Sequence, residues 1–335
     1  MEITTKPIVV VSKCLEFAEC RYNGDVLSDQ TVRSLTPFVT FIPVCPEIEI
    51  GLGIPRETIR IIKEGEQHLL VQPSTRADLS QQMNSFADAF LQNVGEVDGF
   101  ILKSRSPSCS VKDVKVYSGW EKAPVVESAP GFFGAKVNTY FPYAAIEEEG
   151  RLKNFTIREH FFTKLFTLAY FRQLSLDPTI RNLIQFHAEN KYLFMAYNQK
   201  LTKELGKIVA NHEKKEKQQV WNEYAALLPN MFKRAARYTS NINVCEHIMG
   251  HFSTRLSTRE KDHFKHLLHR YRERKLPLSS MTSLLKSWVF RYEQEYLLQQ
   301  RFFEPYPEEL IDLGDSGKGR DYYFARRSTG GKAIG

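Results

Sequence analysis

The chain has 335 residues, of which 42% are hydrophobic, 12% aromatic and 25% charged, with 46 Lys and Arg against 39 Asp and Glu. These proportions supply enough apolar side chains for packed cores, so they exclude a mostly disordered, collagen-like or mucin-like protein. At roughly 100–200 residues per domain, the length predicts about two domains.

The charge is divided unevenly along the chain. Residues 1–150 contain 14 Lys and Arg against 20 Asp and Glu, a net charge of −6, whereas residues 151–335 contain 32 against 19, a net charge of +13. This contrast favours an acidic first domain and a basic second domain. The basic half suits an anionic partner such as RNA or a nucleotide, although a solvated helical surface explains the same excess.

No segment has the apolar length of a membrane-spanning helix, about 18–20 residues, because the best run, residues 8–12, is as short as a strand. The first residues also lack the apolar block and the cleavage site of a signal peptide. We therefore expect a cytoplasmic protein without a membrane partner. Its five cysteines are too few for a disulfide framework, and a cytoplasmic location keeps thiols reduced.

The first half predicts strands that alternate with helices. Apolar and β-branched runs predict buried strands over 7–12, 39–44 and 99–103. The remaining elements are a helix over 27–37 with Ser28 as its N-cap, a hairpin over 60–72 and a helix over 78–94. This alternation predicts an α/β domain over 1–150 with a mainly parallel, Rossmann-like sheet.

The second half predicts helices only. From about residue 158, apolar residues recur at spacings of three and four, and prolines separate further helices expected over 178–209, 213–238, 240–270 and 278–302. We therefore expect an all-α helical domain over 151–313. The segment 314–335 is rich in Gly and charge without periodicity, and it is expected to be a disordered tail.

Three cysteines, Cys14, Cys45 and Cys109, follow the ends of the three predicted strands. Ligands of parallel sheets bind beyond the carboxyl ends of the strands, so these cysteines are expected to converge on one site. Structural zinc commonly takes four ligands from close pairs, which this chain lacks. An iron–sulfur cluster with three protein thiolates leaves one iron open to a soft ligand such as sulfur. Buried apolar cysteines at strand ends remain the alternative.

Two further cysteines have other interpretations. Cys20 stands six residues after Cys14. It is interpreted as a substrate-side thiol or a structural residue, and a fourth ligand is the less favoured interpretation. Cys245 lies in the helical half and is expected to be an ordinary core residue.

Three motifs resemble the thiouracil desulfidase family (TudS-like) over about residues 7–145, in order and in spacing: Ser12–Leu15 with Cys20–Gly24, Pro43–Glu47, and Leu102–Cys109. Later segments are similar to the helical YbgA-type domain often fused behind that family: residues 186–187, 191–192, 205–206 and 305–310. Fusions of this kind act on thiolated uracil nucleotides, notably 4-thiouridine monophosphate, in the salvage of tRNA nucleotides.

The resemblance implies a 4Fe-4S cluster held by Cys14, Cys45 and Cys109, with one open iron that takes the sulfur of a thiocarbonyl group. The implied reaction is a non-redox, hydrolytic C–S cleavage that converts 4-thio-UMP to UMP and hydrogen sulfide. The same motif match places Glu47 and Ser106 beside the cluster, with Glu47 as general base and Ser106 orienting the water or the pyrimidine. On residue type alone, Glu47 is equally a helix-capping carboxylate and Ser106 a turn residue.

Four further residues of these motifs are candidates for substrate binding. Lys103, Arg105 and Arg21 suit the phosphate of a nucleotide, and Tyr22 suits stacking on the pyrimidine ring. Each is equally explained as a surface charge, a partner of an acidic neighbour or a packing residue of a turn.

The segment 255–275 predicts a strongly basic helix, with eight Lys and Arg among His263, His266 and His269. RNA contact is one interpretation and a solvated helix face the other, whereas a metal site of the three histidines is disfavoured because they drift around the helix. The leading hypothesis is therefore an iron–sulfur desulfidase. The alternatives are an RNA-binding or regulatory protein with a structural or sensing metal, and sulfur insertion, which the missing ATP-binding P-loop disfavours.

Overall fold

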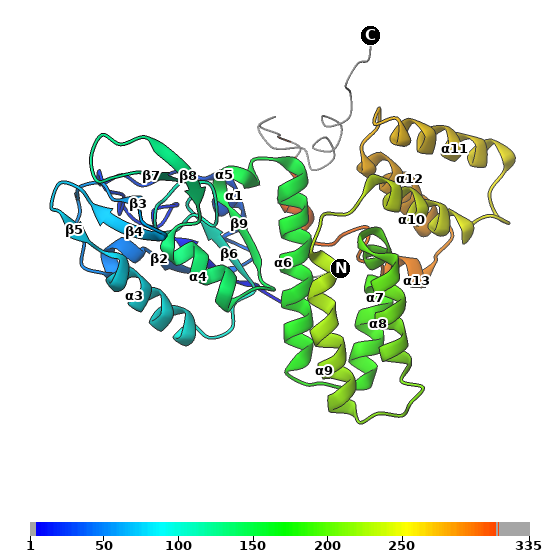
Figure 1. The fold of residues 1–335 in the computed structure, drawn as a ribbon. Helices are drawn as coiled ribbons and strands as arrows, with labels where there is room; N and C mark the ends of the chain where they lie inside the picture. The colour runs from blue at the N-terminus through cyan, green and yellow to red at the C-terminus, as the bar shows by residue number, and fades with distance from the viewer. Residues whose placement is uncertain (1–4, 313, 315–335) are drawn as a thin grey trace, which may run out of the picture. The chain divides into compact units, whose positions relative to one another are not determined.

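The computed structural model describes residues 5–312 and 314, which form two compact units. The α/β unit comprises residues 8–161 with 310–312 and 314, and the helical unit comprises residues 5–7 and 162–309. Figure 1 shows the strands of the described chain in the α/β unit and an entirely helical arrangement in the other. The predicted fold class is confirmed. The expected disordered tail, 314–335, lies outside the described residues except for Gly314.

Four parallel strands form the first sheet, in the order β2-β1-β6-β9. They are β1 (Ile8–Ser12), β2 (Thr40–Val44), β6 (Gly99–Leu102) and β9 (Ala145–Glu148). The central residues of β1, Val9 to Val11, have no exposed surface, as a parallel sheet covered on both faces requires. The three predicted strands are confirmed as β1, β2 and β6. The sequence of β9 is half glutamate and gave no strand signal.

Helix α1 (Gln30–Leu35) begins three residues later than expected. Asp29, not Ser28, is its N-cap, because an Asp29 carboxylate oxygen accepts a hydrogen bond from the Val32 amide at 3.0 Å. The hydroxyl of Ser28 instead accepts a hydrogen bond from Arg33.

A second, mixed sheet of five strands has the order β5-β4-β3-β7-β8. Its members are β3 (Arg60–Glu64), β4 (Gln67–Gln72), β5 (Ala77–Asp78), β7 (Val114–Tyr117) and β8 (Val125–Ala129). The predicted hairpin is confirmed as the antiparallel pair β3–β4, but β3 also pairs with β7 in parallel. The α/β unit therefore contains two sheets, whereas the sequence predicted one, because the pairing of β3 with β7 joins segments about fifty residues apart.

Two helices of the α/β unit, α3 (Ser80–Asn93) and α4 (Phe132–Tyr140), lie side by side in Figure 1. They pack through Phe86 and Phe133, whose ring centroids are 6.2 Å apart. Their apolar faces share one core with Val10 of the parallel sheet and Ile61 of the mixed sheet. Two short helices, α2 (Pro46–Glu49) and α5 (Glu149–Leu152), directly follow β2 and β9.

Helix α6 (Phe155–Ser175) begins in the α/β unit and continues into the helical unit. The helices that follow are α7 (Ile180–Tyr197), α8 (Gln199–Ala210), α9 (Lys217–Leu227), the 3₁₀ helix η1 (Leu228–Phe232), α10 (Tyr238–Gly250), α11 (Thr258–Arg272), α12 (Leu278–Arg291), α13 (Glu295–Leu298) and the 3₁₀ helix η2 (Glu308–Leu310). Cys245 has no exposed surface and packs in the apolar core of this unit, as expected.

Each long helix predicted after residue 178 is divided in the structure. Between α7 and α8, Asn198 adopts an extended backbone conformation and its side chain accepts a hydrogen bond from the Leu201 amide at 3.1 Å. This N-cap starts a new helix inside a segment whose apolar spacing alone predicted one helix. Over residues 5–312, none of the helices combines the length and the apolar character needed to cross a membrane.

Candidate functional site

A cavity of about 800 Å³ lies at the carboxyl ends of β1, β2 and β6. Cys14, Cys45 and Cys109 all line it, and so does Cys20. Cys14 is partly exposed, whereas the other three are buried. The structure therefore brings the three predicted cysteines together, because neighbouring parallel strands end at the same edge of the sheet.

Hydrogen bonds to Ser106 and to helix α4 hold the loop that carries Cys109. The Ser106 hydroxyl accepts hydrogen bonds from the amides of Ser108, at 3.3 Å, and Cys109, at 3.1 Å. The Gly134 amide, near the start of α4, donates to the Ser108 carbonyl at 3.0 Å. Ser106 is thus a turn residue, and it also lines the cavity.

Two glycines, the N-cap residue of α4 and one in its first turn, allow this loop to approach the helix closely, and the sequence analysis missed both. A Cβ atom at Gly131 would lie 2.5 Å from the Ser108 carbonyl oxygen, and one at Gly134 would lie 2.1 Å from that of Ser110. Only glycine leaves room for the backbone at these positions. Their spacing of three residues at a helix start was the available sequence signal.

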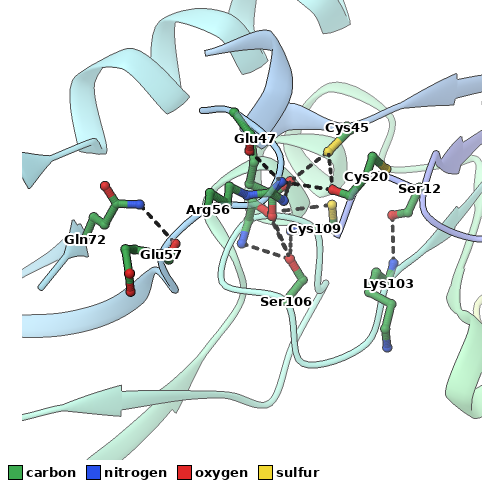
Figure 2. A network of polar contacts seen from close by, with 12 residues as sticks. Ser12, Cys20, Cys45, Glu47, Arg56, Glu57, Gln72, Lys103, Ser106 and Cys109 are labelled. Atoms are coloured by element: carbon green, nitrogen blue, oxygen red, sulfur yellow. Dashed lines mark hydrogen bonds and ion pairs between the residues drawn. The ribbon is translucent and has the colours of Figure 1, made fainter. Parts of the chain in front are cut away.

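Glu47 lies on α2, two residues after Cys45, and its carboxylate is buried in the cavity wall. Ser108 donates a hydrogen bond to Oε1, and the Ser106 hydroxyl lies 3.5 Å from the same oxygen. Oε2 lies 3.4 Å from the Cys45 thiol. No side chain caps α2, so the helix-capping role considered for Glu47 is not what the structure shows. Figure 2 shows this carboxylate directed toward the cysteines and serines.

Arg56 completes this network, although no sequence feature marked it. Its side chain is only 8% exposed and its Nη2 lies 4.0 Å from the Glu47 carboxylate. Its Nη1 donates hydrogen bonds to the carbonyls of Cys20, at 3.0 Å, and Gly53, at 3.4 Å. Arg56 therefore connects the loop of Cys20 to Glu47, as the dashed contacts of Figure 2 show.

The pKa values of the buried thiols are raised. For Cys45 the largest cause is its interaction with the Cys20 thiol, followed by burial and the charge of Glu47. Burial is the largest cause that raises the pKa of Cys109, and a hydrogen bond with the Cys14 thiol raises the pKa of Cys20 to about 11. Thiolates at these positions therefore need a compensating positive charge, such as a metal centre.

The residues predicted to bind substrate also line the cavity, but two of their charges are already compensated. Lys103 forms an ion pair with the buried Glu149. Arg21 lies 3.8 Å from Asp25 and 5.5 Å from the ring centre of Tyr22, which is 45% exposed. Arg105 is exposed at a positive φ of 59° and forms no ion pair with any other described residue.

The mixed sheet forms a further wall of the cavity that the sequence analysis missed. Arg60, Lys115 and Tyr117 all line the cavity from β3 and β7. The Arg60 guanidinium lies 4.8 Å from the ring centre of Tyr117. Only the pairing of β3 with β7 brings these residues to the cysteines, and that pairing was not predicted.

The basic helix of the second half is confirmed as α11, which begins with a capping box of Ser257 and Glu260. It buries Phe264, Leu268 and Tyr271 on one face. Within residues 5–312 and 314, no group of three or more His, Cys, Asp and Glu side chains is placed to hold a single metal ion, and this includes the three histidines of α11.

Two family models match separate parts of the chain, one within the α/β unit and one within the helical unit. The family model described as 2-thiouracil desulfurase matches residues 9–149, and the model described as a protein of unknown function, DUF1722, matches residues 191–307. The uncharacterized protein YbgA of Escherichia coli (strain K12) is 27% identical over 136 residues, which cover 40% of this chain and 80% of that protein.

Two other similarities were found. The uncharacterized protein YbbK of Bacillus subtilis (strain 168) is 30% identical over 109 residues, which cover 30% of this chain and 72% of that protein. The solved structure of the 4Fe-4S-dependent thiouracil desulfidase TudS aligns with 44% of this chain and 93% of its own, at 22% identity and a TM-score of 0.34.

Proposed function

The chain belongs to the 2-thiouracil desulfurase family and carries a DUF1722 domain of the YbgA type, and from this premise we propose that it is an iron–sulfur-dependent desulfidase of thiolated uracil compounds. The preferred substrate in this proposal is 4-thio-UMP. Water replaces the sulfur without a change of oxidation state, so the products are UMP and hydrogen sulfide. We assign the reaction to residues 1–150 and treat 151–313 as the accessory helical domain.

One observation carries this proposal: three cysteines from separate loops meet a buried, hydrogen-bonded carboxylate in a single cavity. Three thiols without a nearby histidine suit iron–sulfur chemistry better than an oxygen-ligated ion. Among the described residues, no three or more His, Cys, Asp and Glu side chains are placed to hold a single metal ion. An iron–sulfur cluster is larger than a single ion, so its thiolate ligands lie farther apart. The cavity volume also lies within the usual range of about 300–1,000 Å³ for small-molecule sites.

In this proposal Cys14, Cys45 and Cys109 would hold the 4Fe-4S cluster, which supplies an open iron as a Lewis acid for the thiocarbonyl sulfur. The Glu47 carboxylate accepts a proton from the attacking water at one of its oxygens. The hydroxyls of Ser106 and Ser108 donate to that carboxylate and hold it in place, and the Ser106 oxygen, which belongs to a residue of the cavity wall, accepts a hydrogen bond from the water.

The surrounding residues keep this arrangement fixed. Arg56 stabilises the negative charge of Glu47 inside the protein, where a carboxylate without a cation would be costly. Burial of Cys45 and Cys109 excludes solvent from two of the three thiols. A cytoplasmic location, where thiols stay reduced, belongs to the same proposal.

The test is turnover by the full chain after anaerobic reconstitution with iron and sulfide. We expect the thiocarbonyl absorbance of 4-thio-UMP to disappear while sulfide and UMP appear in equal amounts, in an iron-dependent manner. A reconstituted protein that leaves 2-thiouracil, 4-thiouracil, 4-thiouridine and 4-thio-UMP all unchanged would contradict the proposal.

RNA contact by the helical domain is a second, independent proposal, supported by α11. Because this helix buries one apolar face, four basic residues remain exposed: Arg259, Lys265, Arg270 and Arg272. Binding through such a face depends steeply on salt concentration. Gel-shift titration with RNA at two salt concentrations tests it, and binding that is absent at low salt would contradict it.

A further inference from the structure

The cavity collects basic side chains in a part of the chain that is acidic overall. Residues 1–150 contain 14 Lys and Arg against 20 Asp and Glu. The cavity lining reverses this ratio, with three acidic residues, Glu47, Glu57 and Asp113, against seven basic ones: Lys13, Arg21, Arg56, Arg60, Lys103, Arg105 and Lys115. A cavity lined by one sign of charge concentrates ligands of the opposite sign, so this cavity favours an anionic ligand.

Three of the seven cations are already paired with carboxylates. Lys103 pairs with Glu149, Arg21 with Asp25, and Arg56 with Glu47. The other four, Lys13, Arg60, Arg105 and Lys115, form no ion pair with any residue that the structure describes. The positive charge available to a ligand therefore comes from this second set, and not from Lys103 or Arg21, which the sequence suggested.

Two of the unpaired cations stand next to each other on the mixed sheet. The register pairs Ile61 of β3 with Val116 of β7, so the preceding residues, Arg60 and Lys115, are also neighbours. Ile61 and Val116 are fully buried in the core. Since side chains alternate between the faces of a strand, Arg60 and Lys115 share the opposite face, on the cavity side.

The Arg60 guanidinium is held in place without losing its charge. It lies over the ring of Tyr117 at 4.8 Å, and its Nη1 donates a hydrogen bond to the Glu121 carbonyl at 2.9 Å. Both partners are neutral, so the remaining N–H groups and the positive charge stay available. A fixed guanidinium group beside an ammonium group matches the geometry and charge of a phosphate.

We propose that Arg60 and Lys115 form an anion subsite that binds the phosphate of the nucleotide while the thiolated base lies toward the cysteines. The inference rests on the proposed desulfidase function and adds how the site distinguishes a nucleotide from a nucleoside. Lys13 and Arg105 stand next to Cys14 and Ser106 in the chain, so in this proposal they belong to the part of the cavity that takes the base. Arg60 and Lys115 come from the other sheet, the wall on which the phosphate binds.

The experiment compares UMP with uridine as ligands, and 4-thio-UMP with 4-thiouridine as substrates, for the full-length chain. Lys115→Gln is the main variant, because Lys115 is exposed and forms no ion pair with any described residue. The double change Arg60→Gln with Lys115→Gln removes the whole subsite. Lys122→Gln is the matched control, since Lys122 is an exposed lysine of the same unit that does not line the cavity.

For the wild type we expect UMP to bind at least about tenfold more tightly than uridine. One strong charge-assisted hydrogen bond to the phosphate is enough for this difference in affinity. Lys115→Gln should reduce that preference several-fold and the double change should abolish it, whereas Lys122→Gln should keep the full preference of the wild type. Equal binding of UMP and uridine by the wild type, or a full preference retained in the double variant, would overturn the inference. If no thiolated compound is turned over while the UMP preference follows the variants, the desulfidase proposal fails and the anion subsite stands.

Discussion

Glu47 is the residue on which the candidate site depends most. Its carboxylate receives the hydroxyl of Ser108, lies near the thiol of Cys45 and is paired with the buried Arg56. A carboxylate needed only for stability would not have to face a cavity of cysteines. This position suits proton transfer to or from a ligand held between the cysteines and the serines.

The first prediction concerns Glu47→Gln, which keeps the shape of the side chain and removes the base. We expect the reconstituted variant to keep its cluster absorbance and to lose turnover by at least about 100-fold, the usual contribution of a general base. The matched control is Glu57→Gln, because Glu57 lines the same cavity and is exposed. Equal turnover rates in the two variants would remove Glu47 from the mechanism.

A second prediction concerns Arg56. Replacement by Ala leaves the buried Glu47 without its cation and the Cys20 carbonyl without its donor, so the free energy of unfolding should fall by about 2–4 kcal/mol. Urea unfolding of the cluster-free protein measures this loss. Arg33→Ala is the control: its ion pair with Glu16 is exposed, and its loss should cost less than about 1 kcal/mol. Similar losses in both variants would show that Arg56 is no more than a surface charge.

At this scale the sequence predicted residues that lie directly after strands or inside recognisable motifs. All nine residues proposed from it line the cavity, Cys14 and Arg105 among them. It could not predict Arg56, because nothing local marks an arginine that reaches across to another loop. Nor could it show that Lys103 is paired with Glu149, since 46 residues separate the partners.

At the scale of elements, the loop of residues 106–110 depends on helix α4. Gly134→Ala would place a Cβ atom 2.1 Å from the Ser110 carbonyl oxygen, so either the loop or the helix must shift. We expect a loss of stability of about 2 kcal/mol or more, together with reduced cluster incorporation, because Cys109 lies in this loop. Gly119→Ala is the control, since its Cβ atom meets only Ala123 at 3.7 Å. Normal cluster loading of Gly134→Ala would contradict this account of the loop.

A partly buried histidine, His187, lies between helices α7 and α9 and makes the stability of the helical unit depend on pH. His187 contacts the Tyr224 hydroxyl at 3.1 Å, and burial lowers its pKa to about 4. The unfolded chain, with an ordinary histidine pKa of about 6.5, binds the proton more readily, so stability is present above pH 6.5 and is lost as the pH falls toward 4.

Lowering the pH from 7 to 5 should therefore reduce the free energy of unfolding of the wild type by about 2 kcal/mol. Urea unfolding at the two pH values, compared with His187→Gln, isolates the effect of this group from those of other titrating residues. The variant should lose less stability on acidification than the wild type. Identical losses in the two proteins would mean that His187 does not titrate as its burial indicates.

Elements with strong local signals were predictable and elements that depend on distant pairing were not. The apolar runs of β1, β2 and β6 and the spacing of α3 were enough to place them. β7 and β8 are half-exposed strands that become strands by pairing with β3, and α4 is short. In the helical unit the periodic pattern was correct, but single caps such as Asn198 divide the predicted helices.

At the scale of the whole molecule, the charge distribution predicts that the proposed activity depends on ionic strength. Raising the salt concentration from about 0.05 M to about 0.5 M shortens the range of electrostatic attraction several-fold. The kcat/KM for 4-thio-UMP should therefore fall, whereas that for the uncharged 4-thiouridine should change little. Parallel salt titrations of the two substrates provide the measurement, and equal slopes would contradict a cavity that attracts anions.

The overall charge of the chain was a poor guide to this cavity. Net charge alone attributes anion binding to the basic second half, yet the acidic first half concentrates half of its 14 basic residues around one site. Composition averages over a surface, and only folding determines which charges meet. The α/β first half and the mostly helical second half, in contrast, could be predicted from composition and periodicity, because those properties extend over many residues.

The most direct test of the central claim measures sulfide released from 4-thio-UMP, together with bound iron, in Cys109→Ala and Cys245→Ala variants reconstituted side by side. Both thiols are buried, but only Cys109 lines the cavity. We predict that Cys109→Ala loses cluster absorbance and sulfide release, while Cys245→Ala keeps both. Sulfide release by Cys109→Ala at the rate of the wild type would contradict the claim that this cavity holds the reactive cluster.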